Sequence, residues 1–113
     1  MVRVYLSGPI TLGDVGANIH RAIEVYHQLL ADGFAVFCPH LDMLAHIQSP
    51  QPYSTWMAND LAWVSASHVV LRLPGESRGS DQETEYARFL GIPVVYSIEA
   101  LHGFRSSEPD LAR

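Results

Sequence analysis

The sequence predicts an α/β domain with a parallel sheet, because strand-like and helix-like segments alternate along the chain. Short apolar runs at residues 2–6, 34–38, 69–73 and 93–96 have the length of buried strands. The segments between them carry apolar residues at a helical period. Such alternation forms parallel β-α-β units with right-handed crossovers. We therefore expect a three-layer, Rossmann-like (flavodoxin-like) domain with four or five parallel strands and helices on both faces.

The length and composition predict a single domain, residues 1–113, and leave a small anionic ligand possible despite the negative net charge. The apolar fraction of 48% is ordinary for a globular protein, and the formal net charge is −5. No basic block is present, so binding to a nucleic acid polymer is not expected. Cys38 is the single cysteine, which suits a reducing cytoplasm. We expect neither a signal peptide nor a membrane span, since no apolar run approaches roughly 20 residues.

The first half of the chain predicts a strand, a helix and a second strand. The sequence SGP ends the first strand, residues 2–6. Asn18 is the expected N-cap of the first helix, and Gly33 ends it before the strand at residues 34–38. Residues 39–52 contain three prolines, and we expect a loop there. A loop of that length exceeds the usual connection of about 2–6 residues, which is typical of a lid or binding loop.

The second helix is expected to start at Ser54 or Thr55 and carries an acid on its apolar face. Asp60 lies between Met57 and Val64 at helical spacing, an unusual place for a charge. A surface position, or a buried acid that caps another element, would also account for Asp60. The apolar neighbours favour a functional carboxylate.

Residues 69–91 form the stretch around which we expect the site. A buried strand, residues 69–73, ends at a Pro-Gly turn, and a polar loop leads to a helix that we expect to start at Ser80. In α/β sheets, strand ends and helix N-termini meet in one ligand crevice. Glu83 lies on the inward face of this helix. A capping box from Ser80 to Glu83 explains Glu83 equally well at this point.

The end of the chain predicts a last strand, a short helix and a polar tail. Residues 93–96 follow a Gly-Ile-Pro stop and are apolar. A helix is expected over residues 98–104. Residues 106–113 are polar, and we expect them to be frayed.

Three chemical groups should converge at the carboxyl ends of the strands: Tyr5, Asp60 and Glu83. Two carboxylates and a phenol suit chemistry at the anomeric carbon of a sugar, where one acid attacks and the other handles a proton. Small residues and backbone N–H groups lie beside them, at Ser77, Gly79 and Ser80.

Other residues are weaker candidates. His40, at the start of the long loop, is expected to face a nucleobase, and Trp56 to stack on one or to serve as a core aromatic. His40 and His46 flank Asp42, but their spacing matches no metal pattern. We therefore expect neither a metal nor a cofactor.

Three motifs occur together in a specific order. Residues 5–10 read YLSGPI, residues 59–63 read NDLAW, and residues 77–87 read S-x-G-x-x-x-E-x-x-x-A. In these motifs the sequence resembles the nucleoside 2-deoxyribosyltransferase superfamily. It is most similar to the 2′-deoxynucleoside 5′-monophosphate N-glycosidases and their small uncharacterised bacterial and phage relatives. The resemblance extends from Val2 to about Val95.

The resemblance implies a role for each matched residue. Glu83 matches the nucleophile, Asp60 the second acid, Tyr5 the tyrosine that positions the nucleophile or sugar, and Ser77 a serine that contacts a 5′-phosphate. Pro9 and Thr11 replace a serine and an arginine of the monophosphate hydrolases, so the need for a 5′-phosphate stays open. The expected substrate-binding residues are Ser7, Gly8, Pro9, Ile10, His40, Trp56, Ser77, Gly79 and Ser80.

The function predicted from the sequence is cleavage or transfer of the N-glycosidic bond of a nucleoside or nucleoside monophosphate. One alternative is a phosphoribohydrolase, whose Pro-Gly-Gly-x-Gly-Thr-x-x-Glu loop is echoed at residues 74–83. The other is a nucleotide-binding sensor without turnover. A homodimer is expected, because the second helix carries more aromatic surface than one sheet face needs, at Tyr53, Trp56, Met57 and Trp63.

Overall fold

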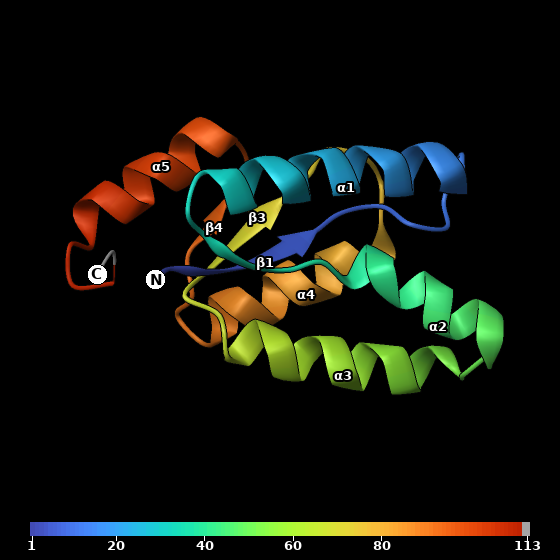
Figure 1. Ribbon diagram of the computed structural model, residues 1–113. Helices are drawn as coiled ribbons and strands as arrows, with labels where there is room; N and C mark the ends of the chain where they lie inside the picture. The colour runs from blue at the N-terminus through green and yellow to red at the C-terminus, as the bar shows by residue number, and fades with distance from the viewer. Residues whose placement is uncertain (112–113) are drawn as a thin grey trace.

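The computed structural model describes residues 1–111 and shows a four-stranded parallel sheet flanked by helices (Figure 1). The strand order is β2-β1-β3-β4, and every neighbouring pair is parallel. The predicted α/β, Rossmann-like fold is therefore confirmed. The elements in chain order are β1 (Arg3–Ser7), α1 (Val15–Ala31), β2 (Ala35–Phe37), the 3-10 helix η1 (Pro39–Leu41), α2 (Asp42–Gln48), α3 (Tyr53–Ser65), β3 (Val69–Arg72), α4 (Arg78–Phe89), β4 (Val94–Val95) and α5 (Ile98–Ser107).

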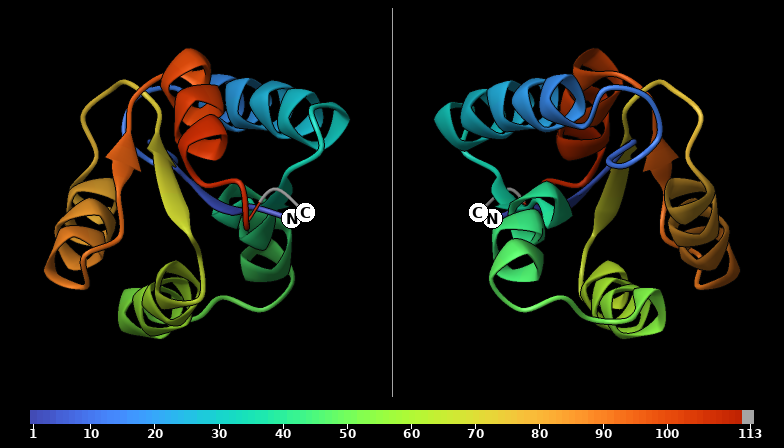
Figure 2. Two further views of the ribbon diagram at one scale, coloured as in Figure 1. Left: turned by 90° about the vertical axis from the view of Figure 1, so that its left-hand side faces the viewer. Right: turned by 90° about the vertical axis from the view of Figure 1, so that its right-hand side faces the viewer.

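Helices cover both faces of the sheet (Figures 1 and 2). Helices α1 and α5 cover one face, where Ala22 and Leu101 join a buried cluster with Val4 and Leu6 of β1. Helices α3 and α4 cover the other face. There Val64 and Ala87 pack with Tyr5 and Val70 in a second, smaller buried cluster.

The alternation of side chains along β1 decides which residues reach the site. Val4 and Leu6 point toward α1, so Tyr5 points to the α3–α4 face of the sheet. Ser7, two residues further, shares that face and is fully buried. The chain leaves β1 for β2 on one side and reaches β3 on the other, so the strand order reverses beside β1. Such a reversal opens a crevice at the carboxyl ends of the strands.

The start of α1 differs from the sequence-based expectation. Asp14, not Asn18, caps α1, and its side chain accepts a hydrogen bond from the backbone N–H of Ala17. Asn18 lies inside the helix, and its amide instead donates to the carbonyl oxygens of Ile10 and Leu12. Asn18 therefore ties the β1–α1 loop to the first turn of α1.

Residues 39–52 are not the extended loop that we expected. They form η1 and the short helix α2, and α3 then starts at Tyr53 behind Pro52 rather than at Ser54 or Thr55. Pro39 stands at the start of η1. A proline is favoured at this position because the first N–H of a helix has no partner within the helix and the φ of proline is already helical.

The C-terminal region is more ordered than the expected frayed tail. Helix α5 continues to Ser107, and Leu111 packs against the cluster beneath α1. The last two residues of the predicted tail, 112 and 113, lie outside the described residues. Among residues 1–111, no helix is both long enough and apolar enough to cross a bilayer.

Candidate active site

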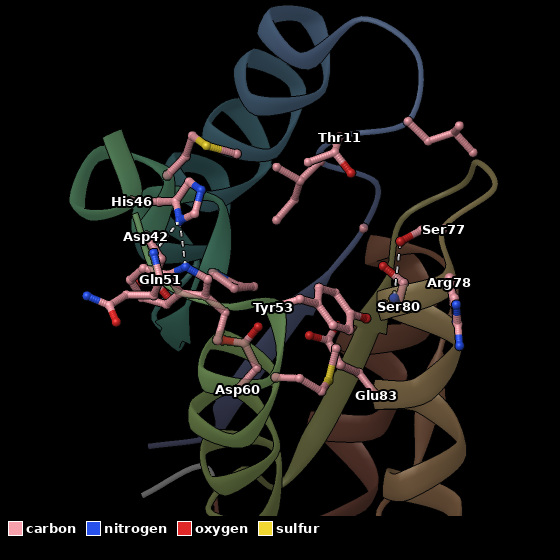
Figure 3. Close-up of a pocket in the computed structure, with 18 residues that line it drawn as sticks. Thr11, Asp42, His46, Gln51, Tyr53, Asp60, Ser77, Arg78, Ser80 and Glu83 are labelled. Atoms are coloured by element: carbon pink, nitrogen blue, oxygen red, sulfur yellow. Dashed lines mark hydrogen bonds between the residues drawn. The ribbon is translucent and has the colours of Figure 1, made fainter. Parts of the chain in front are cut away.

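A cavity of about 700 Å³ opens at the carboxyl ends of β1 and β3 (Figure 3). The loop after β1, the η1–α2 segment, α3 and the first turns of α4 form its walls. The β1 and β3 loops pack closely beneath it. A Cβ added to Gly75 would come within 2.7 Å of Pro9 Cγ, and Gly75 has a φ of +117°. Only glycine allows this backbone conformation and this approach, so the loops after β1 and β3 pack against each other.

Glu83 lies on the inward face of α4 and is held by two hydroxyl groups. Tyr5 Oη donates to Glu83 Oε2 at 2.6 Å, and Ser7 Oγ donates to Oε1 at 2.8 Å. Both donors come from β1, and all three side chains are buried. Burial raises the pKa of Glu83, while the bonds from Tyr5 and Ser7 lower it.

The capping role considered for Glu83 is excluded. Ser77 is the N-cap of α4, and its Oγ accepts a hydrogen bond from the backbone N–H of Ser80 at 3.1 Å. Helix α4 therefore starts at Arg78, two residues before the expected position. Glu83 lies more than one turn beyond the cap, and its carboxylate accepts hydrogen bonds from Tyr5 and Ser7 instead.

Asp60, on α3, faces the same cavity and is also buried (Figure 3). Its Oδ1 has no hydrogen-bond partner. Burial, followed by the negative charge of Glu83 and then of Asp42, raises the pKa of Asp60 to about 8. Glu83 receives hydroxyl bonds that favour its ionised form, whereas Asp60 Oδ1 receives none, so Asp60 is the acid of the pair that more readily holds a proton. Burial likewise raises the pKa of Tyr5, which keeps its phenol as a donor to Glu83.

The first turn of α4 forms one end of the cavity. Ser77, Arg78, Gly79 and Ser80 line it. Ser80 Oγ is buried and has no hydrogen-bond partner. Gly79 faces Tyr53 of α3, and a Cβ added at Gly79 would lie 3.4 Å from Tyr53 Oη. A helix N-terminus with a free hydroxyl suits an oxygen-rich or anionic group.

The opposite wall comes from α2 and α3 and contains residues that the sequence did not single out for binding. Trp56 Nε1 donates to His46 Nδ1 at 2.8 Å, and the backbone N–H of Gln51 donates to the same atom at 3.2 Å. The remaining donor of the ring is therefore Nε2. Asp42 lies one helical turn before His46, and its Oδ2 is buried without a partner. Burial raises the pKa of Asp42.

Three predicted binding residues do not line the cavity. Ser7 lies beneath it, bonded to Glu83. His40 is buried, and its Nε2 donates to the carbonyl oxygen of Pro9 at 3.1 Å. Burial lowers the pKa of His40. His40 and Pro9 therefore brace the β1–α1 loop, and the expected contact of His40 with a base is wrong.

The other predicted site residues converge on the cavity, with Tyr5 directly behind Glu83. Those that line it are Gly8, Ile10, Trp56, Asp60, Ser77, Gly79, Ser80 and Glu83. Within the described part of the chain, no group of three His, Cys, Asp or Glu side chains is placed to hold a metal ion.

Residues 2–96 match the family described as "Domain of unknown function (DUF4406)". The chain belongs to this family. No curated protein sequence is significantly similar to the chain.

Among solved structures, this DUF4406 chain is similar to one from a study that characterised a 2-deoxyribosyltransferase of Bacillus psychrosaccharolyticus. The TM-score is 0.62 at 19% sequence identity, and the match covers 82% of this chain and 69% of the other. At this identity, the likeness shows a shared fold.

Proposed function

We propose that this protein cleaves or transfers the N-glycosidic bond of a nucleoside or nucleoside monophosphate through a covalent ester on Glu83. The observation that carries the proposal is the pairing of two buried acids with different roles. Glu83 accepts hydrogen bonds from Tyr5 and Ser7, while Asp60 faces the same cavity with a pKa of about 8. An ionised acid beside a protonated acid is the pair that this chemistry needs.

In the first step, a carboxylate oxygen of Glu83 attacks the anomeric carbon and the bond to the base breaks. The electron pair of that bond leaves with the base, and Asp60 delivers its proton to a base nitrogen. Tyr5 and Ser7 hold the carboxylate in place, so little orientation entropy is lost at the moment of attack.

In the second step, the glycosyl ester is resolved. Asp60, now ionised, takes a proton from water or from the N–H of an incoming base, and the oxygen or nitrogen attacks the anomeric carbon. The bond to Glu83 breaks and its carboxylate is restored. Water yields hydrolysis, and a second base yields transfer.

The lining of the cavity supports a base at one end and a sugar 5′ group at the other. Trp56 and Met57 offer a surface on which a base can stack. Asp42 Oδ2 accepts no hydrogen bond within the protein, and an N–H group on the edge of a base would be a suitable donor to it. Ser80 Oγ and Arg78, at the start of α4, suit a 5′-hydroxyl or 5′-phosphate. The structural relative, described as a 2-deoxyribosyltransferase, agrees with this class of substrate.

A panel of deoxynucleosides, ribonucleosides and their 5′-monophosphates, incubated with the protein and analysed by chromatography for free base, tests the proposal. A second, labelled base in the mixture separates transfer from hydrolysis. Free base or exchanged base that disappears in Glu83→Gln supports the proposal. Tight binding without release of base from any substrate would identify a sensor instead and overturn it. No contact in the cavity favours the phosphoribohydrolase alternative.

A further inference from the structure

Arg72, the last residue of β3, is a buried cation outside the cavity. Its exposed fraction is 9%, and it pairs in register with Ser7 of β1. Burying a guanidinium costs free energy unless hydrogen bonds and charges compensate. The position of Arg72 therefore needs an explanation.

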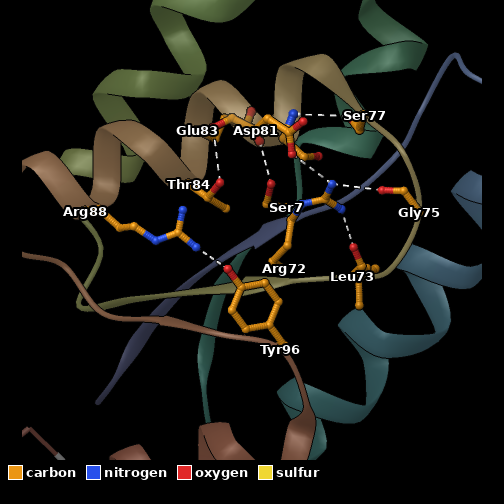
Figure 4. A network of polar contacts seen from close by, with 11 residues as sticks. Ser7, Arg72, Leu73, Gly75, Ser77, Asp81, Glu83, Thr84, Arg88 and Tyr96 are labelled. Carbon is orange, nitrogen blue, oxygen red and sulfur yellow. Dashed lines mark hydrogen bonds and ion pairs between the residues drawn. The ribbon is translucent and has the colours of Figure 1, made fainter.

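The guanidinium of Arg72 is used to hold the β3–α4 loop (Figure 4). Its Nη1 donates to the carbonyl oxygen of Leu73, and its Nη2 donates to that of Gly75 at 2.9 Å. Nη2 also lies 3.3 Å from Asp81 Oδ1, on the first turn of α4. One planar group thus connects the strand end, the turn and the helix start. Lysine has no equivalent fork.

The loop that Arg72 holds is the one that sets the start of α4. Gly75 packs on Pro9 of the loop after β1, and Ser77 caps the helix two residues later. Glu83 follows on the same helix. A shift of this loop would move the cap and the carboxylate together.

We infer that Arg72 is a positioning residue for the proposed reaction, holding the β3–α4 loop and placing a positive charge in register with Ser7, which donates to Glu83. This inference rests on the proposed role of Glu83. The ionisable groups around Glu83 are Tyr5 from β1, Asp60 from α3 and Arg72 from β3, with Asp42 acting on Asp60 from α2. Burial raises the pKa of Glu83, and the hydrogen bonds it receives, followed by the charge of Arg72, oppose that rise. Arg72 alone is a cation among these groups, and Asp81 of α4 faces it at 3.3 Å.

Two substitutions separate the two effects of Arg72. Arg72→Lys keeps the charge but loses the fork, and Arg72→Met loses both. Arg88→Met is the matched control. Arg88 and Arg72 both line a second cavity, of about 280 Å³, but Arg88 is exposed and donates to Tyr96 Oη instead of the loop. Each protein is titrated by NMR with carboxyl-labelled glutamate. The exchange rates of the hydrogen-bonded backbone N–H groups at the two ends of the loop, those of Leu73, Ser80 and Asp81, are also measured. Both readouts use the ligand-free protein.

We expect loop exchange to be about tenfold faster in Arg72→Lys, the factor for one lost charge-assisted hydrogen bond, with the titration midpoint of Glu83 little changed. In Arg72→Met, exchange is faster still and the midpoint moves to higher pH. Arg88→Met should match the parent in both.

A Glu83 midpoint that stays at the parent value in folded Arg72→Met would overturn the electrostatic part of the inference. If Arg72→Met does not fold, the test rests on Arg72→Lys. Loop exchange in Arg72→Lys that equals the parent rate would then overturn the inference. Neither readout depends on turnover. A failure to find any substrate would therefore count against the proposed function alone.

Discussion

Tyr5 Oη lies 2.6 Å from Glu83 Oε2, a buried hydrogen bond between residues 78 positions apart in the sequence. It joins β1, one of the two inner strands of the sheet, to the helix that carries the carboxylate. The bond is short and charge-assisted, so it both fixes the carboxylate and favours its ionised form. Several consequences of this pair can be measured.

Exchange of Glu83 for glutamine tests whether this carboxylate reacts. Glu83→Gln should fold and bind ligand but lose turnover by several orders of magnitude, because an amide cannot form the glycosyl ester. Glu85→Gln is the matched control, since Glu85 is exposed on the same helix. Initial rates of base release give the comparison. Full activity in Glu83→Gln together with a dead Glu85→Gln would show that the wrong carboxylate was chosen.

Removal of the phenol hydroxyl tests the positioning of Glu83. Tyr5→Phe keeps the ring that stacks on Phe37 but leaves Glu83 Oε2 without its donor. We expect kcat to fall roughly 10–100-fold, with a smaller change in KM, because an ill-placed nucleophile mainly affects the chemical step. We also expect the lost buried bond to lower the free energy of unfolding by about 1–3 kcal/mol. Equal kcat in Tyr5→Phe and parent would argue against positioning.

The pH dependence of activity should show Asp60 as the acid. The first step needs protonated Asp60, so kcat/KM should fall as the pH rises through about 8. It should also fall toward acid, where Glu83 takes up a proton. Asp60→Asn should be much slower overall, and its pH profile of kcat/KM should no longer fall at alkaline pH. An alkaline limb that persists in that variant would belong to another group.

The same acid should make stability depend on pH. The pKa of Asp60 is raised in the folded protein, so the folded state holds a proton that the unfolded chain releases above about 4. Stabilisation from this proton is complete at low pH and is lost as the pH rises to about 8. Urea unfolding across that range should give a free energy of unfolding that falls with rising pH in the parent. In Asp60→Asn, the same plot should have a shallower slope. Identical slopes would contradict the raised pKa.

The cap of α4 provides a purely structural prediction. Ser77→Ala removes the acceptor of the Ser80 N–H bond and should destabilise the protein by about 0.5–2 kcal/mol in urea unfolding. Ser54→Ala is a suitable control, because Ser54 is exposed and makes no cap bond. If the two variants unfold alike, the cap contributes nothing measurable.

The homodimer predicted through α3 remains a prediction. Tyr53 and Trp63 are 57% and 48% exposed on α3, and Trp63 stacks on Phe37 with ring centroids 5.0 Å apart. Light scattering at micromolar concentration should give the mass of two chains. Trp63→Glu should shift it toward one chain, because a charge in an apolar interface is costly. A parent protein that is monomeric at this concentration would refute the dimer.

Much of the fold and the central acids could be predicted because they follow simple periodicities. Alternating strands and helices defined the sheet, and the helical period placed Asp60 and Glu83 inward. Helix α2 was not predicted because its apolar side chains face solvent and its polar side chains face the protein. Leu44 and Ile47 are each 72% exposed, while Asp42 and His46 line the cavity. A rule that turns apolar residues inward cannot find such a helix.

The role of His40 could not be predicted for a different reason. Its partner is the carbonyl oxygen of Pro9, 31 residues earlier, and backbone acceptors leave no mark in the sequence. Arg72 is similar, since two of its three partners are loop carbonyl oxygens. Buried polar residues with backbone partners become visible only once the chain is folded.

The alternation of side chains along β1 also limits how this protein could evolve or misfold. Val4 and Leu6 fill one core, and Tyr5 and Ser7 between them hold Glu83. A slip of β1 by one residue would exchange the two sets, burying hydroxyls under α1 and turning aliphatic groups toward the carboxylate. Insertions or deletions in this strand should therefore abolish packing and chemistry together, whereas changes of length in the β1–α1 loop leave the strand intact.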